Sequence, residues 1–324
     1  MATSDISLPL HGWIILDKPL GTGSTQGVGA VKRALREGGY PKVKVGHGGT
    51  LDPLATGVLP IALGEATKLA GRMLDSDKVY EFTIGFGAET DTLDLEGKVI
   101  ATSGVRPTRA QLEAVLTLFT GPINQVPPAY SALKVDGARA YDLARAGQEV
   151  VLATRQVTIH SLRHPSESWD PITEECTRPA RDPSFRWDDM LASITLTAHV
   201  SKGTYIRSLA RDIAYALNTV GHVTMLRRTK AGPFTLDNAI SLDFLFEKSM
   251  AQALEDVCLP LTAGLDDIPA LPVTPDQAGL LRQGRVLIGI AAHDGLHLAK
   301  DGETPVALVE AIAGNVRVVR GFNL

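Results

Sequence analysis

The sequence of 324 residues is poor in cysteine and has no long apolar run. Its two cysteines, Cys176 and Cys258, suit neither a disulfide framework nor a tetrahedral metal site, so a reducing cytoplasm is expected. The apolar runs are far too short to span a bilayer, and residues 1–10 lack the basic start and apolar core of a secretory signal. These absences exclude a disulfide-rich secreted domain and a helical membrane protein.

Strong charge of either sign is also missing. The formal net charge is −4, which argues mildly against a protein that coats nucleic acid. The acidity is local, because residues 163–189 hold four basic and seven acidic side chains, and the rest of the chain is nearly neutral. Candidates for a basic face elsewhere are Lys32, Arg33, Arg36, Lys42, Lys44, Arg227, Arg228 and Lys230. Ordinary solvated charges explain any one of them equally well.

The apolar patterning mixes strands and helices without a steady strand–helix alternation, which favours an α+β fold with a mixed, largely antiparallel sheet. A strand at Gly12–Leu16 is expected to stop at the charged and proline residues that follow it. Further strands are expected at 58–63, 80–86, 157–162 and 194–200, and helices at 25–37, 108–119 and 206–217.

The texture of the sequence changes after Pro260. Residues 270–324 contain short apolar runs separated by glycine and aspartate, which predicts a small β-rich C-terminal domain. The chain is longer than one ordinary core usually fills. We therefore predict two domains, residues 1–262 and residues 263–324.

The densest motif is Gly46–Gly57, which contains four glycines in twelve residues. Glycine allows close backbone approach and positive φ, and Pro53 holds Asp52 away from helical geometry. Such a loop can present the Asp52 carboxylate to a ligand. A turn whose aspartate caps the next segment is an equally good interpretation from composition alone.

A second motif, Ser201–Leu209, lies where a strand passes into a helix. Arg207 falls in the first turn of that helix, where the helix dipole disfavours a cation. A nearby carboxylate or phosphate would compensate, and Asp52 is the candidate. Taken alone, a surface arginine is the simpler interpretation.

Six segments together resemble the signature segments of the tRNA pseudouridine synthase B (TruB) family. They occur in one order over residues 12–245, which is far more specific than any single motif. The segments are Leu16–Pro19, Gly46–Gly57, Asp75–Tyr80, Tyr130–Lys134, Lys202–Arg207 and His222–Arg228.

The resemblance implies an enzyme that converts uridine to pseudouridine at position 55 in the T arm of tRNA by base flipping, without a metal or organic cofactor. Asp52 corresponds to the catalytic aspartate, the nucleophile. Five residues correspond to substrate-binding positions: Tyr80 stacks on the base, Arg207 pairs with the catalytic carboxylate, His47 contacts the RNA loop, and Tyr205 and Leu226 line the pocket. Gly23 departs from the family, where many relatives have a hydroxyl residue.

The resemblance assigns residues 1–262 to a catalytic domain and residues 263–324 to an RNA-binding domain of the PUA type. Within the first, residues 122–150 correspond to a segment that folds over the RNA arm, with Tyr130, Lys134, Arg139, Tyr141 and Arg145 suited to backbone and stacking contacts. Residues 163–189 are expected to be an acidic surface insertion. The partner is tRNA, no membrane or obligate protein partner is expected, and the enzyme is expected to be a monomer.

Two other functions compete with this one. A non-catalytic tRNA-binding or RNA-chaperone protein would use the same fold without chemistry, but Asp52, Tyr80 and Arg207 together favour the enzyme. A glycine-loop phosphotransferase is disfavoured because Gly21–Gly29 lacks the Gly-Lys-Ser/Thr ending of a phosphate loop. The acidic run Glu89–Asp94 does not have calcium-loop spacing, so no metal site is expected there.

Overall fold

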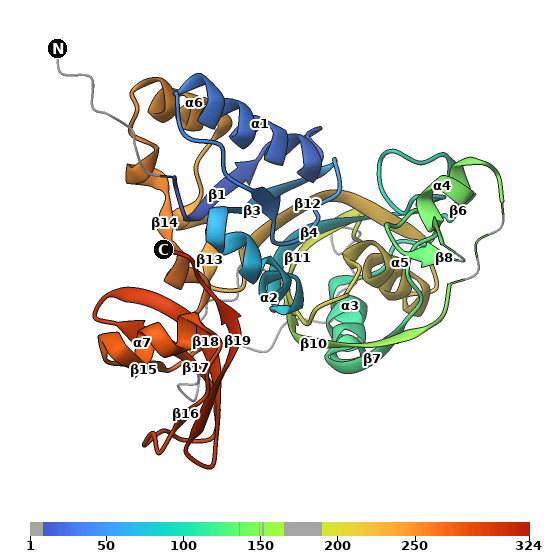
Figure 1. Ribbon diagram of the computed structural model, residues 1–324. Coiled ribbons are helices and arrows are strands. Elements are labelled where there is room, and N and C mark those ends of the chain that lie inside the picture. The colour runs from blue at the N-terminus through green and yellow to red at the C-terminus, as the bar shows by residue number, and fades with distance from the viewer. Residues whose placement is uncertain (1–8, 136, 149, 151, 165–189) are drawn as a thin grey trace, which may run out of the picture. The chain divides into compact units, whose positions relative to one another are not determined.

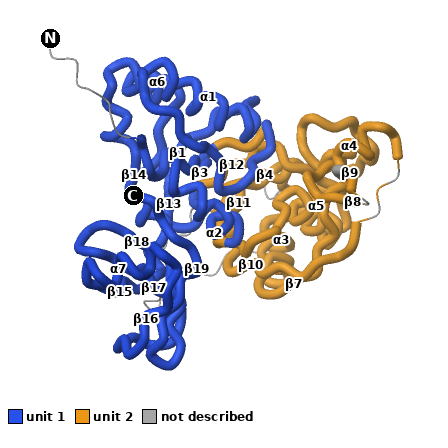
Figure 2. Tube along the Cα trace, viewed as in Figure 1, with its two compact units in different colours: residues 1–53, 57–75, 230–324 blue, residues 54–56, 76–229 orange. Residues whose placement is uncertain are grey.

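The computed structural model describes residues 9–135, 137–148, 150, 152–164 and 190–324, which form two compact units (Figures 1 and 2). Unit 1 comprises residues 1–53, 57–75 and 230–324, and unit 2 comprises residues 54–56 and 76–229. Both units mix helices and strands, which confirms the predicted α+β class. Within the described ranges, no helix has the length and apolar character needed to cross a membrane.

The strands in the N-terminal part of unit 1 pair antiparallel. Strand β1 (Gly12–Lys18) pairs with β3 (Ala55–Leu63) and β14 (Leu259–Pro260), and β2 (Val45–His47) also pairs with β3. Trp13 is fully buried and its ring lies 5.3 Å from that of Phe234 in β13 (Phe234–Thr235). The same core includes Val58, Ala62, Leu261 and Leu265.

Two helices of unit 1 lie side by side in Figure 1: α1 (Ser24–Glu37) and α6 (Leu242–Met250). The predicted helix at 25–37 is thus confirmed. The hydroxyl of Ser249 in α6 donates to the carbonyl of Ala34 in α1, at 2.5 Å. A shorter helix, α2 (Ala70–Asp75), completes this part of the unit.

The prediction that the first strand stops at Leu16 is wrong, because β1 continues through Asp17 and Lys18. Both residues pair in register with β3. Lys18 is fully buried, and its ammonium donates to three backbone carbonyls. A buried charge is tolerated when it is hydrogen-bonded, so the charged residue did not end the strand.

The C-terminal part of the chain forms a separate five-stranded sheet, as its β-rich texture predicted. The strand order is β15–β17–β18–β19–β16, and only the β15–β17 pair is parallel. Their bounds are Ala270–Pro272, Leu287–Ile288, Gly295–Asp301, Thr304–Ile312 and Asn315–Gly321 for β15 to β19, with α7 at Pro275–Arg282. The predicted division into domains at residue 262 and the PUA character of this part stay predictions.

The strands of unit 2 form part of a ten-stranded sheet, in the order β12–β4–β11–β10–β7. The bounds are Lys78–Phe86 for β4, Gly121–Gln125 for β7, Arg155–Arg163 for β10, Ser193–Val200 for β11 and Gly221–Ala231 for β12. Alternate side chains of β4 and β11 face a core that also takes the buried faces of α3 (Arg109–Leu116) and α5 (Ile206–Ala216). The predicted strands at 80–86, 157–162 and 194–200 and the helix at 206–217 are confirmed.

Small elements surround this sheet. They are β5 (Ala88–Thr90), β6 (Val99–Thr102), β8 (Lys134–Val135), β9 (Ala138–Arg139) and α4 (Ala140–Arg145). Of the acidic insertion predicted at 163–189, Arg163 ends β10, and residues 165–189 lie outside the described residues.

Candidate active site

The loop that carries Asp52 connects β2 to β3 in unit 1, and close packing requires its glycines. A Cβ on Gly48 would lie 2.6 Å from the Cβ of Met73, so no larger residue fits there. The amide of Gly48 donates to the carbonyl of Pro60 at 2.8 Å. Gly49 has φ of 151°, which other residues rarely adopt. The loop backbone is therefore fixed against β3 and α2.

The residue before Asp52 is held by a serine. The amide of Leu51 donates to the hydroxyl of Ser24 at 2.7 Å, and this hydroxyl donates back to the Leu51 carbonyl at 3.0 Å. Ser24 is buried at the start of α1. Gly23, the residue before it, lacks the hydroxyl group that many TruB relatives have at that position. The hydroxyl of Ser24 nevertheless contacts the loop.

The residue after Asp52 is held by a lysine. The carbonyl of Pro53 accepts from the ammonium of Lys18 at 3.2 Å and from the amide of Gly21 at 2.9 Å. The same ammonium donates to the carbonyls of Thr22 at 2.5 Å and Pro19 at 3.1 Å. The lysine thus joins the end of β1 to the loop.

The two site residues of unit 1 are both half-buried. Asp52 lies between two residues whose backbones are fixed, so its carboxylate is presented from a rigid support. His47 ends β2, and its Nδ1 accepts from the amide of Gly49 at 3.4 Å. An acceptor Nδ1 is the arrangement of an imidazole whose proton is on Nε2.

In unit 2, Tyr80 and Leu226 pack against the same hydrophobic core. Tyr80 lies in β4 opposite Ala198 of β11, and Leu226 lies in β12. Both side chains are half-buried and pack against the buried core of the unit. An aromatic and an aliphatic side chain supported by a packed core suit the apolar faces of a base.

Tyr205 precedes α5 and is fixed through a buried glutamine. The amide of Tyr205 donates to Oε1 of Gln125 at 2.8 Å, and Nε2 of Gln125 donates to the Tyr205 carbonyl at 3.1 Å. Gln125 is fully buried at the end of β7. The guanidinium of Arg155 lies over the Tyr205 ring, 5.1 Å from its centre. Both the backbone and the ring of Tyr205 are thus positioned.

Arg207 is only 5% exposed, so it is not an ordinary surface arginine. Its guanidinium donates to the carbonyls of Thr92 at 2.9 Å and Tyr130 at 3.0 Å. Oδ2 of Asp94 lies 3.4 Å from Nη1 of Arg207. This carboxylate compensates for a cation in the first turn of a helix. The pairing of Arg207 with Asp52 stays a prediction.

The acidic run that includes Asp94 serves as a set of hydrogen-bond acceptors. The two carboxylate oxygens of Glu89 accept from the hydroxyl of Tyr215 at 2.9 and 2.7 Å, and Asp91 accepts from the amide of Lys98 at 2.9 Å. Burial first, and then Glu89, raise the pKa of Tyr215 to about 12. The hydroxyl therefore stays a donor throughout the physiological range.

Comparison with known proteins identifies the family. Residues 39–206 match the N-terminal domain model of the TruB family pseudouridylate synthases, and residues 207–266 match the tRNA pseudouridylate synthase B C-terminal domain. The tRNA pseudouridine synthase B of Novosphingobium aromaticivorans is 62% identical over 97% of this chain and 98% of its own. That of Zymomonas mobilis is 58% identical over 97% of this chain and 96% of its own. This chain belongs to the TruB family.

A solved structure supports the same fold at low identity. It is an H/ACA ribonucleoprotein bound to a substrate RNA containing 2'-deoxyuridine, and the matching chain is 21% identical. The likeness has a TM-score of 0.67 and covers 97% of this chain and 86% of the other. Membership in the TruB family favours an enzyme over a non-catalytic RNA-binding module.

The segment that begins at Pro122 contacts α5 within unit 2. The hydroxyl of Ser208 donates to the carbonyl of Val126 at 2.8 Å. The rings of Tyr130 and Tyr141 meet edge to face at 5.9 Å, and the guanidinium of Arg145 lies 4.9 Å from the Tyr141 ring centre. This segment, interpreted as an RNA cover in a TruB protein, therefore carries aromatic and cationic groups that support one another.

One candidate for the basic face is wrong. Arg228 is 1% exposed, because it is an inward-facing residue of β12. A buried guanidinium contributes nothing to a surface that meets phosphates. Its neighbour Arg227 is half-buried and donates to the hydroxyl of Thr56 at 3.3 Å.

Four residues that hold the predicted site residues in this TruB chain were not predicted. They are Lys18, Ser24, Asp94 and Gln125, which hold Asp52, Tyr205 and Arg207 through hydrogen bonds between segments far apart in sequence. Lys18 and Asp94 stand in segments that the sequence singles out, but without this function. Nothing in the sequence marks Ser24 or Gln125 as buried.

Proposed function

We propose that the protein isomerises uridine to pseudouridine at position 55 in the T arm of tRNA, with Asp52 as the nucleophile. The observation that carries the proposal is the support of Asp52. In a chain of the TruB family, one half-buried carboxylate stands between Leu51 and Pro53, whose backbones are fixed by Ser24 and Lys18. A nucleophile held in this way needs little reorganisation when the substrate arrives.

The reaction breaks the bond from the sugar to N1 of uracil and forms a bond from the sugar to C5. The base leaves and returns, so a group on the enzyme must stay joined to the substrate between the two steps. An ionised aspartate meets this requirement. The C5 hydrogen passes to solvent and N1 gains a proton, so atoms and electrons balance without an oxidant or a cofactor.

The target base must leave the stack before Asp52 can reach it. We assign stacking on the flipped base to Tyr80, and the pocket wall to Leu226 and Tyr205. The support for Tyr80 and Leu226 is that both are half-buried and pack on one core. The support for Tyr205 is its double hydrogen bond to Gln125.

Two further residues are assigned to the Asp52 carboxylate and to the RNA. Arg207 forms an ion pair with the Asp52 carboxylate and orients it, in addition to its contacts with Asp94 and Thr92. His47 contacts the distorted RNA loop through Nε2, since its Nδ1 accepts from Gly49. A charge-assisted bond from an arginine is among the stronger orienting contacts available to a carboxylate.

The partner of this enzyme is tRNA, bound through a local basic face, and the enzyme acts as a cytoplasmic monomer. Residues 122–150 cover the RNA arm, and residues 263–324 act as a PUA-like RNA-binding domain. The affinity for tRNA should fall steeply with salt despite the acidic chain, because each phosphate contact releases counterions. An affinity that is flat in salt would contradict this face.

Tritium release tests the activity directly. The purified full chain is given a tRNA transcript labelled with tritium at C5 of uridine. We expect about one equivalent of tritium released per tRNA, and none from a matched transcript with cytidine at position 55. The non-catalytic RNA-binding alternative predicts that tRNA binds and no tritium is released.

A further inference from the structure

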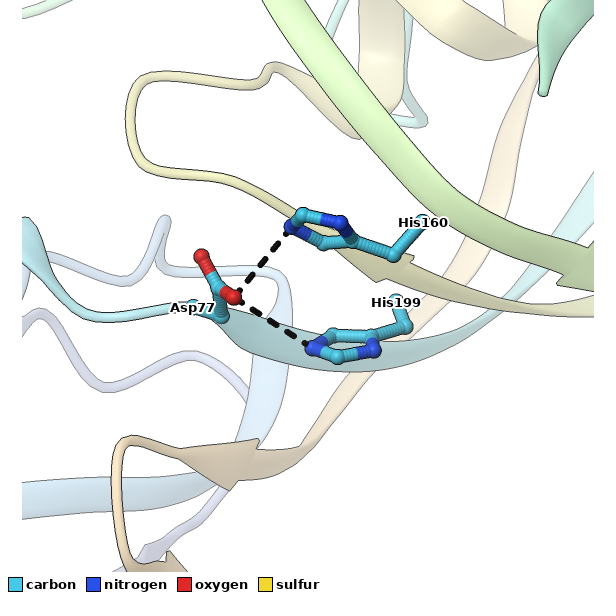
Figure 3. Close-up of side chains that lie close together, drawn as sticks. All are labelled: Asp77, His160 and His199. Atoms are coloured by element: carbon cyan, nitrogen blue, oxygen red, sulfur yellow. Dashed lines mark ion pairs between the residues drawn. The ribbon is translucent and has the colours of Figure 1, made fainter. Parts of the chain in front are cut away.

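Three side chains of unit 2 that the proposed reaction does not use converge on one point: Asp77, His160 and His199. Figure 3 shows both imidazoles directed at the same carboxylate. The Nε2 atoms of His160 and His199 lie 3.2 and 3.7 Å from one oxygen, Oδ2 of Asp77. All three donor atoms lie within 4.8 Å of one another, and no second group of this kind occurs among the described residues.

The register of the sheet brings two of the three together. His199 of β11 lies opposite Val79 of β4. Asp77 comes two residues before Val79 and so faces the same side of the sheet. It is therefore a diagonal neighbour of His199. Side chains at diagonal positions on neighbouring antiparallel strands are within reach of each other.

A β-bulge adds the third residue. Ile159 of β10 pairs with Val200 and Ser161 pairs with His199, so His160 is an extra residue in the ladder. Ile159 stays buried in the core while His160 is exposed. A bulge disrupts the ladder locally and redirects a side chain, and bulges are over-represented next to active sites.

We propose that Asp77, His160 and His199 form a binding site for a divalent first-row transition metal ion, with Zn²⁺ as the ion that fits best. Two imidazoles and one carboxylate are typical Zn²⁺ ligands, whereas Mg²⁺ and Ca²⁺ require oxygen ligands. With metal–ligand bonds of about 2.0–2.2 Å, tetrahedral geometry separates the donor atoms by about 3.3–3.5 Å. The two separations from Oδ2 of Asp77, 3.2 and 3.7 Å, bracket this range, and the two Nε2 atoms lie within 4.8 Å of each other.

An ordinary hydrogen-bonded cluster explains the geometry less well. A separation of 3.7 Å is too long for a hydrogen bond, so only His160 is within hydrogen-bonding distance of Oδ2. The two rings lie 4.7 Å apart and are tilted by 47°, which is poor for stacking. A metal ion would be ligated by both Nε2 atoms and by the carboxylate at once.

The site is accessible, and it connects two strands to the residue that precedes a third. The side chains of Asp77, His160 and His199 are 48, 37 and 32% exposed, so an ion can enter from solvent. Three protein ligands leave one tetrahedral position, which water fills. A bound ion would join β10 and β11 to the residue that leads into β4, the strand that carries Tyr80. Because it binds only the folded chain, it would also raise the melting temperature.

Zinc titration of the full chain tests the proposal. The protein is prepared without a polyhistidine tag, dialysed against EDTA, and titrated with Zn²⁺ by calorimetry, with Mg²⁺ as a comparison ion. We expect one Zn²⁺ per chain and no Mg²⁺. The variants His160→Gln, His199→Gln and Asp77→Asn should each weaken zinc binding at least about tenfold, since even outer-shell changes at metal sites typically cost that much.

His293→Gln is the matched control, because His293 is an exposed histidine of unit 1. It should bind zinc as the wild type does and show the same rise in melting temperature. The three replaced side chains are exposed or half-buried, so circular dichroism should show intact folds. Zinc binding that is absent from the wild type, or equally strong in His160→Gln, would overturn the proposal.

Discussion

The loop around Asp52 and the turn that begins α5 are both rigid, but they are held in opposite ways. Asp52 is fixed through its neighbours, since Leu51 and Pro53 are bound to Ser24 and Lys18. Arg207 is fixed through its own guanidinium, which contacts two carbonyls and Asp94. In the first case, the loop is fixed through the backbones of the residues on either side of the functional group. In the second, the functional group is itself part of the structure.

Because of this difference, mutants of the two residues test different things. A change at Asp52 removes the proposed nucleophile and leaves the bonds of Leu51 and Pro53 in place. A change at Arg207 removes structure and orientation together, so its kinetic effect cannot be assigned to one cause. The clean tests of position are therefore the supporting residues, Lys18 on one side and Gln125 on the other.

The largest effect is expected for Asp52→Asn. Turnover should fall at least about 10³-fold, roughly 4 kcal/mol, because the nucleophile is lost. The affinity for tRNA should change less than about threefold, because one carboxylate carries little of a phosphate-dominated interaction. Single-turnover kinetics and filter binding measure the two quantities.

Asp266→Asn is the matched control for that variant, because Asp266 is an exposed aspartate of the same unit. It should leave both quantities unchanged. Turnover of Asp52→Asn within about tenfold of wild type would remove the distinction between a reacting loop and a supporting turn.

Lys18→Met should have the next largest effect. Three backbone carbonyls inside the protein lose a charged donor. Leaving a buried acceptor unsatisfied costs about 1–3 kcal/mol in the free energy of unfolding. The loop should then hold Asp52 less firmly, so kcat falls more than the affinity for tRNA. Urea unfolding and steady-state kinetics check both. Lys32→Met, at an exposed position of α1, should match the wild type, and an equal loss there would refute the explanation.

On the α5 side, Gln125→Leu removes both hydrogen bonds to the Tyr205 backbone. We expect a loss of about 1–3 kcal/mol in the free energy of unfolding and a rise in KM, because Tyr205 lines the proposed pocket. The neighbouring residue Asn124 is exposed, so Asn124→Leu is the comparison. If the two leucine variants behaved alike, the buried glutamine would not be what positions the turn.

The smallest effect concerns Asp212 in α5. Burial raises the pKa of this carboxyl, partly offset by Arg211. A carboxyl pKa that is raised in the folded state makes the contribution of Asp212 to stability fall as the pH rises from about 4 through the folded pKa. Above the folded pKa this contribution is constant. Asp212→Asn should therefore unfold less readily at pH 7, by about 1 kcal/mol or less, and lose this part of the pH dependence. A variant that is less stable at pH 7 would reverse the sign.

The sequence predicted the elements better than the contacts between them. Periodicity located α1, α5, β4 and β11, because each has one apolar face that must be buried. It failed at Lys18, where hydrogen bonds to carbonyls allow a charged residue to continue a buried strand.

The site was predicted from resemblance, and its supports were not. Gln125 and Ser24 gain meaning only when β7 and α1 meet segments 80 and 27 residues away. The cluster of Asp77, His160 and His199 was not predicted for the same reason, because its residues come from β10, β11 and the residue before β4, and His160 occupies a bulge. Contacts between residues so far apart cannot be predicted from a local sequence pattern.

Mapping pseudouridine in cellular tRNA tests the central claim most directly. Cells that lack this protein are compared with the same cells supplied with the wild type or with Asp52→Asn, and position 55 is read in each. We predict that uridine 55 is unmodified without the protein, is converted when the wild type is supplied, and stays unmodified with Asp52→Asn. Pseudouridine at position 55 in cells that lack the protein, or its return with Asp52→Asn, would contradict the account.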